Sequence, residues 1–219
     1  MMTAAAAEDD LVAENMSCRR GERLVFAGLS LVVPAGGGVV LSGANGSGKS
    51  SLLRLLATLL TPVAGHLLWG GSAVTEDIAA YRASVHYVGH LDAIKPGLGV
   101  RETLGFWTAL RGAEPVALDR ALATFGLDRV ADWRCQWLSA GQRRRLALAR
   151  LIAIPAPIWL LDEPAAALDI EGEARLAEVI AVHRQAGGRV VVATHQALAL
   201  PGASEVRLGE FAADPAAAF

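Results

Sequence analysis

Lysine and cysteine are scarce in this chain, with two of each among 219 residues. The cysteines, Cys18 and Cys135, form no C-x-x-C pair and have no histidine at metal-ligand spacing. This pattern indicates two free thiols in a reducing compartment, not a disulfide or a metal site. The formal net charge of −2 provides no basic field of the kind that nucleic-acid-binding proteins carry, so we expect no nucleic-acid partner.

A secretory signal and long hydrophobic runs are also missing. The N-terminal segment carries Glu8, Asp9 and Asp10 where a signal peptide needs basic residues. No apolar run approaches the ~18 residues that span a bilayer, and the longest one, 151–161, contains two prolines. We therefore expect a cytoplasmic chain that reaches a membrane only through a partner.

The segment 43–50 is the most informative one present, because it fits the pattern G-x-x-x-x-G-K-[ST] of phosphate-binding loops. A strand-like run precedes it and a helix-like run follows, so the backbone N–H groups can surround an anion at the positive end of a helix. Lys49 is expected to reach the β- and γ-phosphates of a nucleotide, and the Ser50 hydroxyl to ligate Mg²⁺. The candidate nucleotide-binding residues here are Gly43, Ala44, Asn45, Gly46, Ser47, Gly48, Lys49, Ser50 and Ser51.

Hydrophobic periodicity predicts alternating strands and helices around this loop. Residues 11–37 have the pattern of short antiparallel strands. Strands are also expected over 38–42, 66–71, 85–88, 158–161 and 189–194, and helices over 51–57, 98–111, 116–125, 140–153 and 171–185. We predict an α/β fold that forms a single domain over 1–219, with a helical segment of about 91–151 inserted into a parallel-sheet nucleotide domain.

Two carboxylates follow the apolar strand 158–161. In a phosphate-loop enzyme, an aspartate at the position of Asp162 holds Mg²⁺ opposite Ser50. Glu163 comes one step later, where it could polarise a water that attacks the γ-phosphate. A buried strand that runs into a solvated acidic turn is the alternative interpretation, and the phosphate loop earlier in the chain disfavours it.

The pentapeptide 138–142 precedes a helix that is basic on one side. Ser139 can cap this helix, and Gly141 allows another backbone to approach closely. The helix N-terminus is then a second candidate anion site. An ordinary capped helix is the alternative.

Taken in order, these motifs resemble those of ABC-type ATPase subunits over nearly the whole chain. Asp169, in the sequence Ala-Leu-Asp, resembles the D-loop residue of that family, and His195 resembles its switch histidine, which contacts the γ-phosphate. The signature motif of the family is matched by Leu138, Ser139, Ala140, Gly141 and Gln142.

The resemblance implies a P-loop NTPase fold with a RecA-like core, an N-terminal antiparallel β subdomain and an inserted helical subdomain. It implies ATP and Mg²⁺ as cofactors and Glu163 and His195 as catalytic residues. It also implies a head-to-tail dimer with a second copy of the chain, in which the signature motif of one copy closes on the ATP held by the other. ATP binding would then be coupled to dimer closure.

Two positions depart from the family pattern. His90 stands where a glutamine is usual, in a loop that senses the transmembrane partner. Mg²⁺ prefers oxygen ligands to imidazole, so this change puts direct coordination of the metal by this residue in question. No aromatic residue for stacking on adenine occurs near 17–21, where the chain has Cys18, Arg19 and Arg20. An arginine guanidinium can stack on a base with less apolar contact, so we include Arg20 among the candidate nucleotide-binding residues and leave the residue that stacks on adenine open.

Within the family, the chain is similar to the ATP-binding subunits of bacterial haem exporters of cytochrome c maturation. The similarity lies in the segments 18–26, 87–95, 138–151 and 194–196 and in the compact size. It implies ATP hydrolysis that drives haem handling, integral-membrane partners of the CcmB and CcmC type, and a place at the cytoplasmic face of the inner membrane.

Other functions within and beyond this family are possible. An ABC subunit for another solute is the alternative within the class. A soluble ABC ATPase that acts on DNA or ribosomes is disfavoured, because the chain has one nucleotide domain, no long heptad tract and no basic excess.

Overall fold

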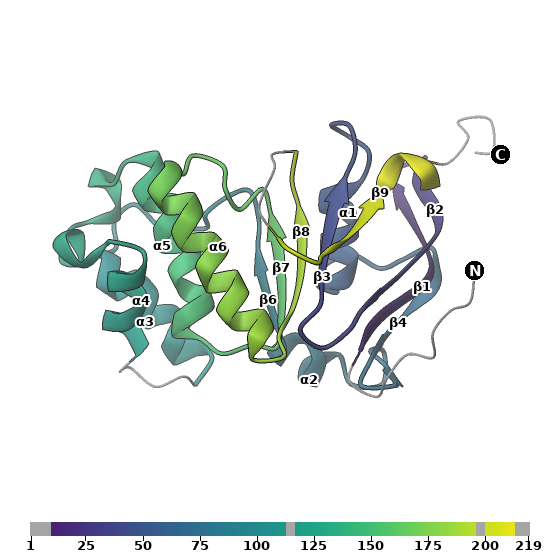
Figure 1. Cartoon of the computed structure of the whole chain (residues 1–219), viewed down its shortest axis with the longest axis horizontal. Helices are drawn as coiled ribbons and strands as arrows, with labels where there is room; N and C mark the ends of the chain where they lie inside the picture. The colour runs from purple at the N-terminus through teal and green to yellow at the C-terminus, as the bar shows by residue number, and fades with distance from the viewer. Residues whose placement is uncertain (1–9, 113–116, 196–199, 213–219) are drawn as a thin grey trace.

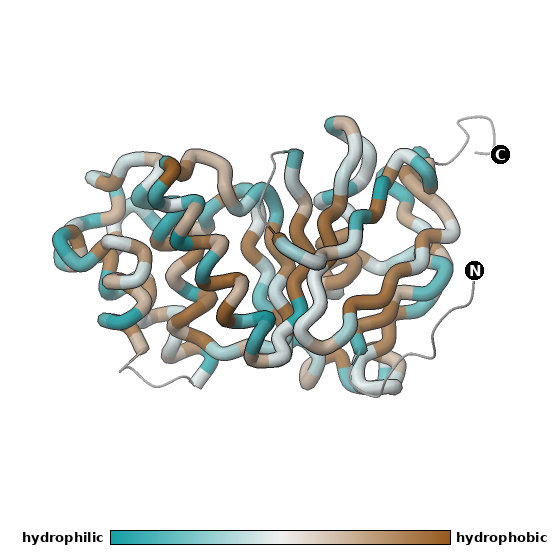
Figure 2. The backbone as a smooth tube through the Cα atoms, in the orientation of Figure 1, coloured by the Kyte–Doolittle hydropathy of each residue, from teal (hydrophilic) through white to brown (hydrophobic). Residues whose placement is uncertain are grey.

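The computed structural model describes residues 10–112, 117–195 and 200–212. Along its long axis the molecule has an antiparallel sheet at one end, a parallel sheet in the middle and a group of helices at the other end (Figure 1). Hydrophobic residues concentrate along the strands and alternate with polar residues along the helices (Figure 2). This is the distribution expected where sheets are buried and helices have one face in solvent.

The antiparallel sheet contains residues from both sides of the phosphate loop, in the strand order β2-β1-β4-β5. The short strands predicted over 11–37 are two long ones, because only the two residues 21 and 22 separate them. The pairing of β1 with β2 is irregular, with register shifts of the kind that β-bulges produce. The strands are β1 (Leu11–Arg20), β2 (Arg23–Val33), β4 (Ala64–Trp69) and β5 (Ser72–Ala73).

The parallel sheet has the order β6-β7-β8-β3-β9, and its neighbouring strands all run in the same direction. Its central strands are apolar except at their ends, because both faces of the sheet are covered. In β7, Trp159 and Leu161 pack among the helices at the end of the molecule, whereas Leu160 packs towards the antiparallel sheet and α1. The strands are β3 (Gly38–Ser42), β6 (Val85–Val88), β7 (Ile158–Asp162), β8 (Arg189–Ala193) and β9 (Ser204–Arg207).

Most helices match the predicted ranges closely, and the predicted 140–153 is α5 itself. The third helix begins at Val100 instead of residue 98, since Gly99 is its N-cap and donates its N–H to Glu102. The short α2 and the edge strand β9 were not predicted. The α-helices are α1 (Lys49–Leu56), α2 (Ile78–Ala83), α3 (Val100–Leu110), α4 (Ala117–Thr124), α5 (Ala140–Ala153) and α6 (Ile170–Gln185), and the 3-10 helices are η1 (Asp128–Val130), η2 (Cys135–Trp137) and η3 (Leu208–Phe211).

Helices α3, α4 and α5 follow β6 and precede β7 in the chain, and they lie together beyond the edge of the parallel sheet (Figure 1). They share one apolar cluster with the facing side of that sheet. Across the described ranges, no helix is both long and apolar enough to cross a membrane.

Candidate nucleotide-binding site

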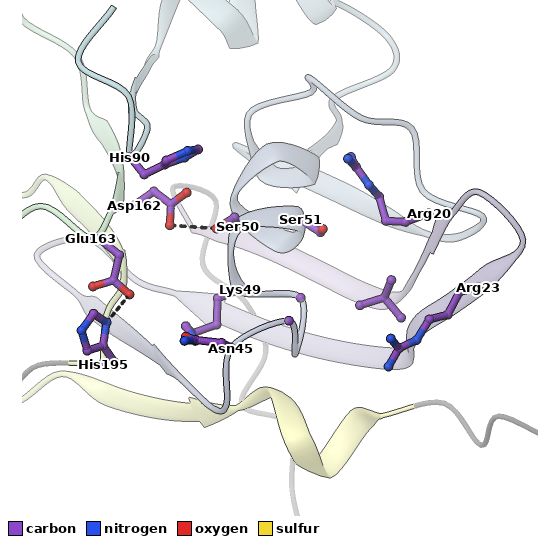
Figure 3. Close-up of a pocket in the computed structure, with 13 residues that line it drawn as sticks. Arg20, Arg23, Asn45, Lys49, Ser50, Ser51, His90, Asp162, Glu163 and His195 are labelled. Carbon is purple, nitrogen blue, oxygen red and sulfur yellow. Dashed lines mark hydrogen bonds and ion pairs between the residues drawn. The ribbon is translucent and has the colours of Figure 1, made fainter.

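The candidate site lies at the edge of the parallel sheet where four strands end. The phosphate loop follows β3, His90 follows β6, Asp162 is the last residue of β7, and His195 follows β8. Because the carboxyl ends of parallel strands share one edge, segments far apart in the chain meet there. A cavity of about 560 Å³ results, lined by Arg20, Arg23, Val25, Asn45, Gly46, Gly48, Lys49, Ser50, Ser51, His90, Asp162, Glu163 and His195 (Figure 3).

Lys49 is nearly buried inside the phosphate loop. Its Nζ atom donates to the carbonyl oxygen of Gly43 at 2.7 Å and to that of Ala44 at 3.2 Å. Both acceptors are neutral. Only the donor of these bonds is charged, so an anion that enters the loop would attract this ammonium group more strongly than either carbonyl does.

Gly48 joins the loop to the antiparallel sheet. Its φ angle of 106° is in the left-handed region. A Cβ atom here would lie 2.8 Å from a methyl carbon of Val25 and 2.9 Å from the ring of Phe26. Only glycine fits, and β2 is thereby held directly against the phosphate loop.

Ser50 and Asp162 meet across the base of the cavity. The serine hydroxyl donates to Asp162 Oδ1 at 3.0 Å. The carboxylate is 1% exposed, and its other oxygen, Oδ2, has no hydrogen-bond partner among the described residues. A buried carboxylate oxygen without a partner, next to a hydroxyl, is the donor chemistry that Mg²⁺ prefers, so these residues fit that ion. In nucleotide-binding proteins Mg²⁺ usually has only one or two protein ligands, and phosphate oxygens supply others. The pair Ser50 and Asp162 matches this number of protein ligands.

Glu163 faces the same cavity as Asp162, although consecutive residues of a strand point to opposite sides. The reason is its left-handed backbone, with a φ angle of 47°. Such a conformation costs about 1–3 kcal/mol for a residue other than glycine. The Glu163 N–H group donates to Ala193 O at 2.8 Å, and its Oε1 lies 2.8 Å from Nδ1 of His195.

The hairpin between β1 and β2 forms the opposite end of the cavity. Arg20 and Arg23 pair in register across its two-residue turn, and both line the cavity. In Figure 3 they lie on the far side of the phosphate loop from Glu163 and His195. The described residues that line the cavity include no phenylalanine, tyrosine or tryptophan. Arg23 was not among the predicted site residues. The two-residue turn could have indicated it, because such a turn pairs this residue with Arg20 across the hairpin.

His90 lines the cavity on the side of Asp162 (Figure 3). Its exposed imidazole follows the end of β6 by two residues. The structure therefore brings the phosphate loop, the two carboxylates, His90 and His195 together around one cavity.

The pentapeptide 138–142 does not line this cavity. Ser139 caps α5 as predicted, accepting from the N–H of Gln142 at 3.1 Å. A Cβ atom on Gly141 would lie 2.9 Å from the carbonyl oxygen of Ala167, so the segment before α6 packs against the start of α5. Asp169 caps α6 by accepting from Gly172 N at 2.9 Å.

Two histidines outside the cavity have lowered pKa values, His86, which is buried, and His183, which is half-buried. The pKa of His86 is lowered to about 3, mainly by burial and then by the nearby charge of Arg150, and a bond to the carbonyl oxygen of Ile154 opposes the shift. Burial likewise lowers the pKa of His183 to about 4, and its ring stacks on that of Trp159. Both side chains are neutral near pH 7.

Comparison with known families agrees with this geometry. Residues 26–166, more than half of the chain, match the family described as ABC transporter. The chain therefore belongs to the ABC transporter family as one of its ATPase subunits. Membership implies that it binds ATP and that it works with transporter subunits in a membrane.

Within the family, the chain is similar to two bacterial proteins that both carry the name cytochrome c biogenesis ATP-binding export protein CcmA. The one from Rhodospirillum rubrum is 57% identical over 94% of this chain and 88% of its own length. The one from Paramagnetospirillum magneticum is 53% identical over 91% and 94%, respectively. A solved structure of a putative ABC transporter ATP-binding protein from Pyrococcus furiosus has the same fold, with a TM-score of 0.82 at 22% identity, covering 94% of this chain and all of that one. The predicted family and fold class are confirmed.

Proposed function

We propose that this chain is the ATP-hydrolysing subunit of an ABC transporter complex that handles haem during the maturation of c-type cytochromes. The observation that carries the hydrolytic role is the pair Glu163 and His195 in the phosphate-loop cavity, with Ser50 and Asp162 beside it. The name of the two relatives from R. rubrum and P. magneticum supports cytochrome c biogenesis as the process. The proposal that the complex handles haem goes beyond what these names say.

ATP binds with its phosphates in the loop 43–50 and its base towards the β1–β2 hairpin. Lys49 exchanges its two carbonyl partners for β- and γ-phosphate oxygens. Arg20 stacks on the adenine, and its partner in register, Arg23, lies beside it.

Hydrolysis begins with a water held by the Glu163 carboxylate. The water oxygen attacks the γ-phosphorus, the bond from that phosphorus to the β-phosphate oxygen breaks, and Glu163 takes the proton of the water. His195, held at 2.8 Å from Glu163, orients the carboxylate and contacts the γ-phosphate. The products are ADP and inorganic phosphate.

Ser50 and Asp162 would hold Mg²⁺ through the serine hydroxyl and the carboxylate oxygen without a partner. When bound, the ion supplies positive charge that offsets the charge of the transferring phosphoryl group. His90 lies close enough to line the same cavity, and its role is communication with the membrane partner instead of metal binding.

The signature residues 138–142 act on the ATP of a second copy in a head-to-tail dimer. Two observations support this: they do not line the cavity of their own chain, and Ser139 and Ala140 are exposed at the N-terminus of α5. Asp169 starts the neighbouring helix and belongs to the same dimer face. Membrane subunits of the CcmB and CcmC type bring the dimer to the cytoplasmic face of the inner membrane.

The biochemical test is Glu163→Gln, which keeps the shape of the side chain and removes the proton acceptor. The variant should bind ATP, fail to turn it over and form an ATP-dependent dimer in size-exclusion chromatography. Glu178→Gln is the matched control, because the same change falls on an exposed residue of α6 outside the cavity. Hydrolysis by Glu163→Gln at the wild-type rate would count against the proposed base.

The cellular test separates haem from other cargoes. Cells with Glu163→Gln should make haem and normal b-type cytochromes, yet lack mature c-type cytochromes on haem-stained membranes, and haem should accumulate on the upstream carrier. Normal c-type cytochromes in these cells would remove the haem proposal and leave an ABC transporter ATPase for another solute.

A further inference from the structure

Arg144 lies in α5, two residues beyond the signature pentapeptide, and only 3% of it is exposed. A buried guanidinium of this kind is costly unless its donors are satisfied. All five of its N–H donors have acceptors available, and the five acceptors are four carbonyl oxygens and one carboxylate oxygen. A polar network that is both buried and satisfied fixes the segments that it joins.

One side of the guanidinium holds the end of β7. Its Nη2 donates to the carbonyl oxygens of Asp162 at 2.8 Å and Glu163 at 2.7 Å, and its Nε donates to that of Pro164 at 3.1 Å. Proline has no N–H, so the peptide group after Glu163 can be oriented only through its carbonyl. The peptide group before Glu163 is fixed on both sides, by Arg144 and by the bond from Glu163 N to Ala193 O.

The other side of the guanidinium holds the loop after β6. Its Nη1 donates to Gly89 O at 2.8 Å, in the peptide group that leads into His90. The same nitrogen pairs with Asp92 Oδ1 at 3.2 Å, which offsets the buried charge. One side chain on α5 thus orients the backbone next to both His90 and Glu163.

We propose that Arg144 is a positioning residue for hydrolysis, which holds Glu163 in its left-handed conformation and ties that conformation to the loop 89–92. The proposal rests on the role of Glu163 in the proposed function. Its consequence is that a displacement of α5 or of this loop changes the direction of the Glu163 carboxylate. Lysine cannot replace arginine here, because three donors on one nitrogen cannot reach five acceptors around a planar fork.

The test compares Arg144→Gln with Arg184→Gln in the full chain. Arg184 is a matched control, since its guanidinium also donates to backbone carbonyls of separate segments, Gly36 and Pro201, but away from the cavity. Arg144→Gln should lower kcat by about 10- to 100-fold, the cost of a small misplacement of a reacting group. Its ATP affinity and KM should stay within about threefold, because the loop that binds phosphate is untouched. Arg184→Gln should lower the melting temperature without lowering kcat, and equal kcat losses in the two variants would overturn the proposal.

A second measurement asks whether Arg144 acts through Glu163. Added to Glu163→Gln, the Arg144→Gln change should lower the residual single-turnover rate by less than about twofold, because coupled residues are not additive. An equal loss in both backgrounds would overturn the proposal while leaving the proposed function intact. Wild-type hydrolysis by Glu163→Gln alone would instead overturn the role of Glu163 and this proposal with it.

Arg144→Lys keeps the test decisive if Arg144→Gln does not fold. It retains the charge opposite Asp92 and loses most of the carbonyl bonds. It should keep ATP affinity and lower kcat by at least about fivefold, since the fork that fixes Glu163 is lost. A wild-type kcat in this variant would refute the positioning role.

Discussion

Asp162→Asn should make the nucleotide-free protein more stable. The carboxylate is 1% exposed, accepts one bond from Ser50 and leaves Oδ2 without a partner among the described residues. An amide keeps the bond to Ser50 and replaces the charged Oδ2 by a neutral NH2 group. The gain should therefore be the extra cost of burying a charge over burying a neutral polar group, about 1–3 kcal/mol. For a chain of this length each kcal/mol moves the melting temperature by about 2–4 °C.

Mg²⁺ and ATP together should offset this advantage of the variant. At 100 times its dissociation constant a ligand stabilises the folded state by about 2.7 kcal/mol. With MgATP the free energy of unfolding of the wild type should rise by this full amount. That of Asp162→Asn should rise only as much as it does with ATP in the presence of EDTA. Thermal unfolding without ligand, with ATP and EDTA, and with MgATP measures each term. Asp132→Asn, whose side chain is 93% exposed, is the matched control and should move stability by less than about 0.5 kcal/mol in any condition.

Two results would refute this reasoning separately. A nucleotide-free Asp162→Asn protein that melts below the wild type would mean that the carboxylate is stabilised in the fold and does not carry an unmet penalty. Equal extra stabilisation of both proteins by Mg²⁺ over ATP alone would mean that Asp162 is not a ligand of the ion.

Further predictions concern single side chains. Lys49→Ala should weaken ATP binding about 10- to 100-fold, as expected for one lost charged hydrogen bond, while the exposed Lys95→Ala should not, and equilibrium binding with labelled ATP distinguishes them. His90→Ala should keep ATP affinity within about fourfold but lose the stimulation of hydrolysis by the membrane partner, and His90→Gln should retain it; ATPase assays with and without the partner test this. At pH values between about 3 and the ordinary pKa of histidine, His86 is protonated in the unfolded state but not in the folded state. Its contribution should therefore lower the free energy of unfolding as the pH falls. From pH 7 to pH 5 its share is about 2 kcal/mol, and His86→Gln should remove that share in urea titrations; an unchanged pH dependence would contradict the buried neutral imidazole.

The sequence alone determined the elements whose signals are local. The phosphate loop, the helix 140–153 and the apolar strand that ends in two carboxylates are each specified by neighbours within a few residues, so their motifs could be predicted. The edge strand β9 could not, because its short polar sequence forms a strand only by pairing with β3. The helix α2 was missed because six residues carry too little periodicity.

Tertiary structure decided which of these pieces share a site. The order β6-β7-β8-β3 brings His90, Asp162, His195 and the phosphate loop to one edge, and no local pattern contains that order. The same holds for Arg144, which in the sequence is one of several arginines of a basic helix. Its five acceptors come from two segments about 20 and 55 residues away in the chain, which only the fold brings around it. Water is excluded from this point, so each N–H donor of the guanidinium needs a partner within the protein.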